Sequence, residues 1–193
     1  MTTLLTAAFG DEVTQRRTIT ALGNDHYRIV EHVSLPTGTT DGLRVGIRFE
    51  LAEGCTDAEW VGLGPWENYP DRRTSALLGR WQRPIDELAL PYIRPQENGG
   101  RGDVRALRLT GPAGEVITTH PVPVQMNVAR NTVDDLEAAK HWWELPDRET
   151  TTVHLDIAHR GVGTGALGPD TRPRHRLTGH TYTWTWELHL RAI

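Results

Sequence analysis

The 193-residue sequence contains a single cysteine, Cys55, so an internal disulfide framework is excluded. No apolar run reaches the length of a membrane-spanning helix. The formal net charge of −4 at pH 7 lacks the positive excess that nucleic-acid binding requires. The first ten residues show no basic segment followed by a long apolar one, so we predict no signal peptide. We therefore expect a cytoplasmic protein without a nucleic-acid or membrane partner.

Phenylalanine is scarce, with two residues, whereas tryptophan occurs seven times. The indole ring offers a flat apolar face and one N–H donor, which suits both a packed core and stacking against a sugar ring. The length fits one domain with a substantial core, and we assign residues 1–193 to a single β-sandwich domain.

Alternation of apolar and polar residues dominates the chain and is typical of half-buried strands. Residues 43–51 place Leu43, Val45, Ile47, Phe49 and Leu51 on one face. Residues 181–190 do the same with alternate aromatic and leucine side chains, from Tyr182 to Leu190. Further alternating segments, separated by clusters of Gly, Pro, Asn and Asp, are residues 26–35 and 151–157. The pattern predicts an all-β fold, an antiparallel sandwich.

One short helix is expected near residues 132–140. Thr132 can cap its N-terminus, with Asp135 three residues on as the reciprocal partner. The helix must end by Pro146, which cannot continue it.

A glycine pattern at Gly163, Gly165 and Gly168 matches a dinucleotide fingerprint in form only. The fingerprint requires a helix directly after the glycines, and two prolines in the next residues forbid one. We therefore expect no cofactor in this chain. The tripeptide at residues 101–103, Arg-Gly-Asp, is interpreted as a coincidence rather than an adhesion motif.

His154, Asp156 and His159 are candidate metal ligands, but His159 points away from the other two on a regular strand. Only a β-bulge would bring the three together, so we predict no metal site. His141 and Glu144 could serve a sugar epimerase as acid and base, although on a strand they would have opposite parity.

The segment Trp60–Arg73, WVGLGPWENYPDRR, combines aromatic rings, carboxylates and arginines. We interpret it as a ribbon at a corner between sheets, with Trp60 and Trp66 packed. Buried polar groups on irregular segments must find partners. We therefore expect its polar side chains to hold backbone and neighbouring loops; these are Glu67, Asn68, Asp71 and Arg72. The alternative is a sugar contact from Trp66 or Tyr69.

Four motifs occur in one order between residues 60 and 170: GLGPWENYPDR, YIRPQENGGRGDVR, NVARNTVDDLEAAKHWWELP and LDIAHRGVGTGALGPD. Together they resemble the C-terminal, small-chain domain of the large β-galactosidases of glycoside hydrolase family two. The resemblance implies an antiparallel supersandwich, similar in shape to galactose mutarotases.

In that family the catalytic carboxylates lie on a TIM barrel, for which this sequence has no pattern. No catalytic residue is therefore assigned here. The resemblance implies instead a wall of the galactoside pocket, with a glycine-rich loop nearest the substrate: Gly165, Ala166, Leu167, Gly168 and Pro169. Leu167 stands where some members present an aromatic ring. Candidate sugar contacts are Trp66, Tyr69, Glu97, Asn98, Arg101, His141 and Trp142.

The family's terminal domain is longer at its N-terminus, so we expect an N-terminally incomplete domain whose partners are a β-galactoside and the rest of the enzyme. Missing strands would leave sheet edges exposed at residues 26–35 and 43–51, which predicts a homo-oligomer. Two alternatives remain open: a free-standing carbohydrate-binding or aldose-epimerase-like protein, and a structural interface module.

Overall fold

The computed structural model describes residues 2–6, 12–163 and 168–192. These residues form one ten-stranded sheet system with one α-helix and three 3₁₀ turns. The strands are β1 (Thr2–Thr6), β2 (Glu12–Gly23), β3 (His26–Ser34), β4 (Arg44–Leu51), β5 (Asp57–Gly64), β6 (Leu77–Pro84), β7 (Arg101–Gly111), β8 (Gly114–Ala129), β9 (Thr151–His159) and β10 (Thr181–Arg191). The helical elements are η1 (Ile85–Glu87), α1 (Val133–Ala138), η2 (Trp142–Glu144) and η3 (Pro173–His175).

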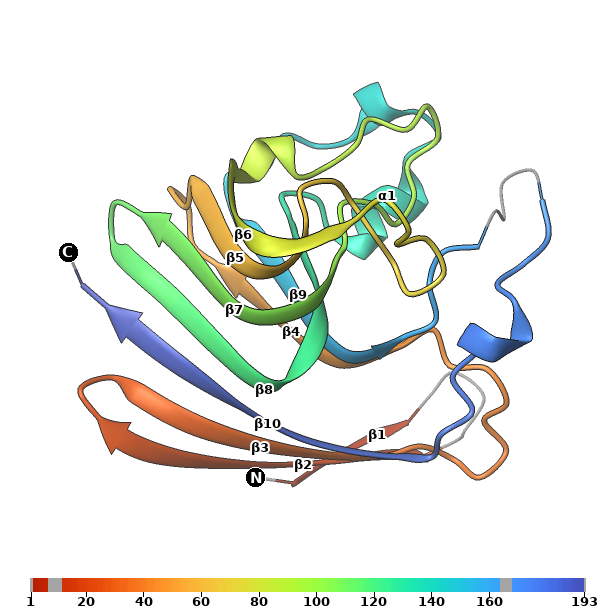
Figure 1. The fold of residues 1–193 in the computed structure, drawn as a ribbon, viewed down its shortest axis with the longest axis horizontal. Coiled ribbons are helices and arrows are strands. Elements are labelled where there is room, and N and C mark those ends of the chain that lie inside the picture. Colours follow the sequence, from red (N-terminus) through yellow and green to blue (C-terminus); the bar gives the residue numbers. More distant parts are fainter. Residues whose placement is uncertain (1, 7–11, 164–167, 193) are drawn as a thin grey trace.

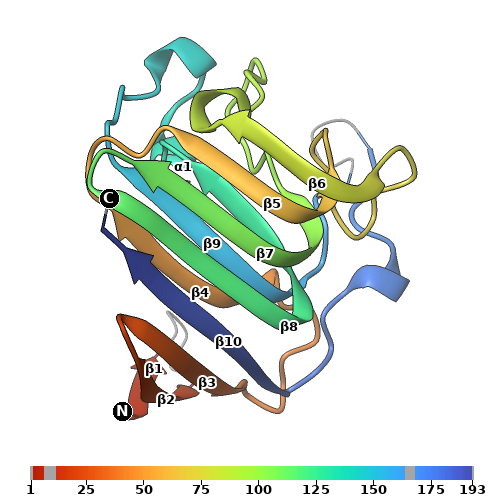
Figure 2. The same ribbon diagram turned by 60° about the vertical axis from the view of Figure 1, so that its left-hand side comes forward.

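Every strand pairing is antiparallel. The main path runs β1-β2-β3-β10-β8-β7-β5-β6, and β9 pairs with both β8 and β4 off this path. Figure 2 shows β10, β8, β7, β5 and β6 following one another across the twisted sheet. The confirmed fold class is therefore all-β, an antiparallel sandwich with one short helix.

Strand β8 is the point at which the sheet forks. Its residues 115–119 pair with β10, whereas residues 125–129 pair with β9. Between these stretches lie Pro121 and Pro123, which have no backbone N–H to donate to a ladder. The β7–β8 register also shifts here, between Ala106↔Thr119 and Val104↔Val124. The prolines thus end one pairing and allow the strand to take a second partner.

The core lies between the two branches of this fork (Figure 1). From β3 and β10 it receives Ile29, Val33, Trp184 and Trp186, and from β4 and β9 it receives Val45, Ile47, Val153 and Leu155. The predicted inward faces of residues 43–51 and 181–190 are confirmed at their centres. Leu43 and Leu190 are exposed, because the first precedes β4 and the second lies at the open end of β10.

The predicted helix is confirmed. Thr132 Oγ1 accepts from the Asp135 N–H, and the Asp135 carboxylate accepts from the Thr132 N–H, which completes a capping box. The helix ends at Ala138 and the next residue, Ala139, is extended, well before Pro146, so the proline does not terminate the helix.

The expectation of two exposed edges is half wrong. Strand β3 is interior, since it pairs with β2 on one side and β10 on the other. Strand β4 pairs only with β9 among the described residues, so its second edge is open there. No helix within the described ranges is long and apolar enough to cross a membrane.

Candidate functional site

The ribbon after β5 is anchored by its polar side chains, as predicted. The Glu67 carboxylate accepts from the Gly99 N–H at 2.8 Å and from the Tyr92 hydroxyl at 2.6 Å, and it also pairs with Arg72. Asn68 is 1% exposed, and its Oδ1 accepts from the Gly102 N–H at 2.8 Å. These contacts fasten the ribbon to the segment that leads into β7.

The two tryptophans of the ribbon differ from each other. Trp60 is 1% exposed, and its Nε1 donates to the Leu63 carbonyl at 3.0 Å, which confirms the prediction that it is packed. Trp66 is 65% exposed, so the prediction that it is packed is wrong. Its place on the irregular segment beyond β5 leaves no neighbouring strand to cover the ring.

Two of the candidate sugar contacts lie in the protein interior. Tyr69 is 1% exposed; its hydroxyl accepts from the Gly100 N–H at 3.0 Å, and burial raises its pKa. The Arg101 guanidinium lies over the Trp60 ring and donates to the Gly99 carbonyl at 2.5 Å. Burial lowers the Arg101 pKa to about 10. Arg101 also begins the Arg-Gly-Asp tripeptide, whose first residue is therefore not presented to a partner.

A charged cluster joins β4, β9 and the loop before β7. Arg44 donates to the Asp156 carboxylate at 2.6 Å and to Glu97 at 3.1 Å. Asp156 is 2% exposed, and burial raises its pKa to about 6 although Arg44 opposes that shift. The Glu97 carboxylate also accepts from Asn127 Nδ2 at 3.2 Å. The cluster fixes Glu97 in place.

A β-bulge changes the expected geometry of the three candidate metal ligands. Val45 pairs with Ala158 and Gly46 with Asp156, so Ile157 has no partner and the strand parity reverses after it. The His159 ring consequently lies against Tyr69 at a tilt of 42°, and its Nδ1 accepts from the Gly161 N–H at 2.9 Å. With Asp156 paired to Arg44, the described residues contain no group of three or more His, Cys, Asp or Glu placed to hold a metal.

A cavity of about 360 Å³ lies between the loop of residues 85–98 and the segment 131–148. Three candidate sugar contacts, Glu97, Asn98 and Trp142, line it together with Asn127 and His154. Burial lowers the His154 pKa to about 4, so the imidazole is neutral at pH 7 and offers one donor and one acceptor. Trp142 is half exposed at this cavity. A carboxylate, an amide, a neutral imidazole and an indole are groups that bind sugar hydroxyls and sugar faces.

His141 does not line this cavity. It precedes η2, where its Nδ1 meets Glu144 Oε1 at 2.8 Å, and its ring stacks on Trp143 with centroids 4.5 Å apart. On a strand, His141 and Glu144 would lie on opposite faces. That expectation does not apply, because the segment is a 3₁₀ turn. Both side chains are exposed and bonded to each other.

The glycine-rich loop is fastened at both ends. Before it, Asp71 accepts from the N–H groups of Val162 at 3.2 Å and Gly163 at 2.7 Å. Gly161 has φ +88°, and a Cβ there would collide with the Asp71 carboxylate. After it, Asp170 pairs with Arg160, which also pairs with Asp41. Gly168 and Pro169 are exposed, whereas Gly165, Ala166 and Leu167 lie outside the described residues.

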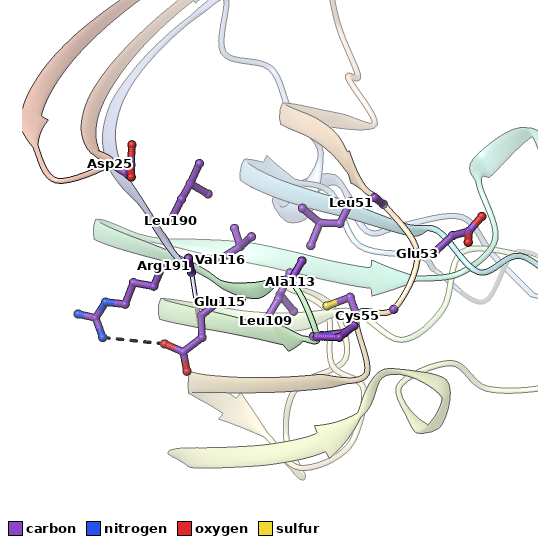
Figure 3. A pocket seen from close by; sticks show the side chains of 16 residues that line it. Asp25, Leu51, Glu53, Cys55, Leu109, Ala113, Glu115, Val116, Leu190 and Arg191 are labelled. Carbon is purple, nitrogen blue, oxygen red and sulfur yellow. Dashed lines mark ion pairs between the residues drawn. The ribbon is translucent and has the colours of Figure 1, made fainter.

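A second cavity, of about 450 Å³, lies by the β2–β3 and β7–β8 turns (Figure 3). Leu51, Leu109, Val116 and Leu190 line it, and the Arg191–Glu115 ion pair lies at its rim (Figure 3). Cys55 also lines it and is buried, as expected for a structural thiol. The polar groups that would orient a sugar are sparse here.

The sequence did not predict Arg44 as a member of the charged cluster, nor Asn127 and His154 as lining residues of the cavity beside Glu97. Each of the three lies on a strand whose alternate residues belong to the core. In the sequence, the polar positions between core residues are indistinguishable from ordinary solvent-facing positions. A signal was present in QMNV (Gln125–Val128), where polar residues alternate with core residues on a buried strand.

Comparisons with known proteins converge on one family. The model for the β-galactosidase small chain matches residues 6–188. A β-galactosidase of Arthrobacter sp. (strain B7) is 35% identical over 136 residues, covering 67% of this chain and 13% of the relative. One from Oenococcus oeni is 32% identical over 165 residues, covering 85% and 16%. One from Klebsiella pneumoniae is 34% identical over 151 residues, covering 78% and 14%.

Among solved structures, a protein of Escherichia coli K12, provisionally described as an aldose 1-epimerase, matches with a TM-score of 0.43 and 13% identity. That match covers 100% of this chain and 64% of the other. The chain thus spans only 13–16% of the length of the three β-galactosidases above.

Proposed function

Because the chain belongs to the β-galactosidase small-chain family, we propose that it is the C-terminal domain of a β-galactosidase and forms one wall of the galactoside pocket. The match over residues 6–188 carries this proposal. The small share of each relative that the chain covers supports a role within a larger enzyme.

The part proposed to lie nearest the substrate is the loop 165–169. Its support is the anchoring on either side, where Asp71 holds Val162 and Gly163, and Arg160 pairs with Asp170. These contacts order the described residues on either side of the loop before any ligand binds, which lowers the entropy cost of binding there. Precise placement of a pocket wall depends on such support.

The carboxylates of this chain are proposed to have no part in bond cleavage, which we assign to the rest of the enzyme. The chain is proposed to need no cofactor of its own and to act in the cytoplasm. Its partners would be a β-galactoside, the remainder of the enzyme and further copies of the same assembly; the open second edge of β4 supports association through strand pairing.

The test is complementation. A β-galactosidase lacking its C-terminal domain, mixed with this chain, should hydrolyse a chromogenic galactoside, whereas neither part alone should do so. A matched control is the same chain with Gly161→Val, which cannot keep the left-handed backbone beside Asp71. Turnover by this chain alone, abolished by mutation of one of its carboxylates, would contradict the proposal.

A second experiment tests the loop. In the complemented enzyme, Leu167→Trp should tighten galactoside binding by about 0.5–1.5 kcal/mol, since an indole ring stacks on the sugar face. Leu167→Ile serves as the control because it adds no ring. Equal Michaelis and inhibition constants for all three proteins would mean that the loop does not reach the sugar.

A second candidate function is carbohydrate binding by the chain itself, which the cavity lined by Glu97, Asn127, Trp142 and His154 favours. Epimerase chemistry is less favoured, because His154, with a pKa near 4, is neutral at pH 7 and lacks the imidazolium proton that a general acid transfers. Galactose titrated onto the isolated chain should perturb Trp142 fluorescence, and Asn127→Leu should remove the effect. A fluorescence spectrum unchanged by galactose would contradict carbohydrate binding by the isolated chain and leave only the proposed role as a domain of a β-galactosidase.

A further inference from the structure

The segment Thr171–Arg176, TRPRHR, carries a dense group of basic residues for which the proposed function has no use. It borders a cavity of about 360 Å³, which lies within the range of small-molecule sites. Gly163 and Pro169, on either side of the glycine-rich loop, also line this cavity. A ligand bound there would therefore lie beside the loop.

Both carboxylates that line this cavity already have partners. Asp71 accepts from two backbone N–H groups of residues 162 and 163. Asp170 pairs with Arg160 and with Arg176, and it accepts from the Thr171 N–H at 2.7 Å. Neither carboxylate pairs with Arg172 or Arg174, and the three arginines of the lining outnumber its two carboxylates.

Two guanidinium groups of the lining have no acidic partner among the described residues. Arg172 and Arg174 are exposed, and Arg174 Nε donates to Nε2 of His175 at 3.0 Å. The third, Arg72, is paired with Glu67. Pro173 begins the 3₁₀ turn η3, whose fixed backbone holds Arg172 and Arg174 at the cavity.

The cavity also contains a buried hydroxyl group without a partner. Thr171 is 2% exposed, it lines the cavity, and its Oγ1 makes no hydrogen bond to any described residue. Buried hydroxyls are normally hydrogen-bonded, so this one has capacity for a partner beyond the described residues, such as a ligand oxygen.

A guanidinium has donors and no acceptor, and the threonine hydroxyl can donate as well. A ligand surrounded by these groups must bring acceptors and negative charge. We propose that Thr171, Arg172 and Arg174 bind a small oxyanion group, such as a sulfate, a phosphate or a carboxylate. The fork of a guanidinium matches the oxygens of such a group in pairs.

The binding test uses the whole chain and sodium sulfate, with sodium chloride at the same ionic strength as reference. Sulfate should bind saturably, by calorimetry and by amide shifts confined to residues 170–176. R172Q/R174Q should weaken the binding about tenfold, since two charge-assisted contacts are lost. R16Q/R105Q is the matched control, because it removes two exposed arginines from β2 and β7.

Thr171→Val should weaken sulfate binding as well. If this buried substitution unfolds the chain, the exposed double variant R172Q/R174Q is sufficient to test the proposal. Binding no stronger than that of chloride, or equal binding by R172Q/R174Q and the native chain, would overturn the proposal. Neither result bears on complementation, so the failure of this site and the failure of the domain role are distinguishable.

The oxyanion could be part of the substrate or a free anion. The experiment that distinguishes these two sources rests on the proposed function, because it uses the complemented enzyme. In the complemented enzyme, a galactoside whose aglycone carries a carboxylate is compared with its neutral amide. A lower KM for the carboxylate, lost in R172Q/R174Q, identifies the substrate as the source. Equal KM values together with sulfate binding identify a free anion.

Discussion

The two-branched core and the loop layer of residues 62–73, 85–100, 160–163 and 168–176 are stabilised by different means. The core contains apolar side chains from all central strands, such as Trp186 and Leu155. In the loop layer, carboxylates and amides bond to backbone N–H groups of other loops, as Glu67 does with Gly99 and Asp71 with Gly163. The core therefore depends on area removed from water, and the loop layer depends on a few specific hydrogen bonds.

This difference determines how the stability of each region should respond to mutation. Loss of a core side chain leaves a cavity that the whole sandwich shares, so the free energy of unfolding falls. Loss of one loop acceptor leaves one or two backbone N–H groups unpaired, while the strands remain in place. The core should respond globally and the loop layer locally.

The largest effect is expected at Trp60, where the two regions meet. Trp60→Ala should lower the free energy of unfolding by about 3–5 kcal/mol, because it opens a cavity and removes the ring beneath the Arg101 guanidinium. Urea denaturation measures this value. Trp60→Phe is the control, since it keeps a ring over the same place. If Trp60→Ala lowered the free energy of unfolding by less than an exposed substitution such as Trp143→Ala, the Trp60 ring would lie outside the core.

A smaller effect is expected from pH at His120, a buried histidine that stacks against Trp186 of the core. Burial lowers the His120 pKa to about 4, below the 6.5 of an unfolded chain. The unfolded state therefore binds the proton more readily, and stability falls as the pH decreases from about 6.5 towards 4. His120→Gln should remove about 2 kcal/mol of the stability difference between pH 7 and pH 4.5.

The control for that experiment is Thr118→Val, which removes the hydroxyl 2.9 Å from His120 Nε2 and keeps the titrating ring. Its pH dependence should remain close to that of the native chain. An unchanged slope in His120→Gln would show that other groups govern the acid transition. The half-buried His154 and the buried His159, whose pKa values are also lowered to about 4, are the next candidates.

The smallest and most local effect is expected at Asp71. Asp71→Asn keeps the size of the side chain but turns an amide donor towards one of two backbone donors, at a cost of about 1–2 kcal/mol. Hydrogen exchange at Val162 and Gly163 should accelerate, while the strand amides keep their protection. Asp103→Asn is the control, since its exposed carboxylate pairs with Arg73 instead. Equal protection at Val162 and Gly163 in both variants would contradict the anchoring role of Asp71.

The sequence by itself determined the strands, the capped helix and the family. These depend on local information: alternation along β4 and β10, the Thr132–Asp135 spacing, and four motifs in order. The anchoring role of Glu67, Asn68 and Asp71 was also predictable, because polar residues on a buried irregular segment need partners.

Only the tertiary structure decided which residues meet. The bulge at Ile157 that turns His159 to the face of Asp156 has no local signal, and neither does the exposure of Trp66. The cavity that joins Glu97 to His154 is formed by elements far apart in the sequence, and so is the contact between Asp71 and Gly163. Such contacts depend on how the strands stack and where β8 changes partner, and a single sequence does not encode that arrangement in any one segment.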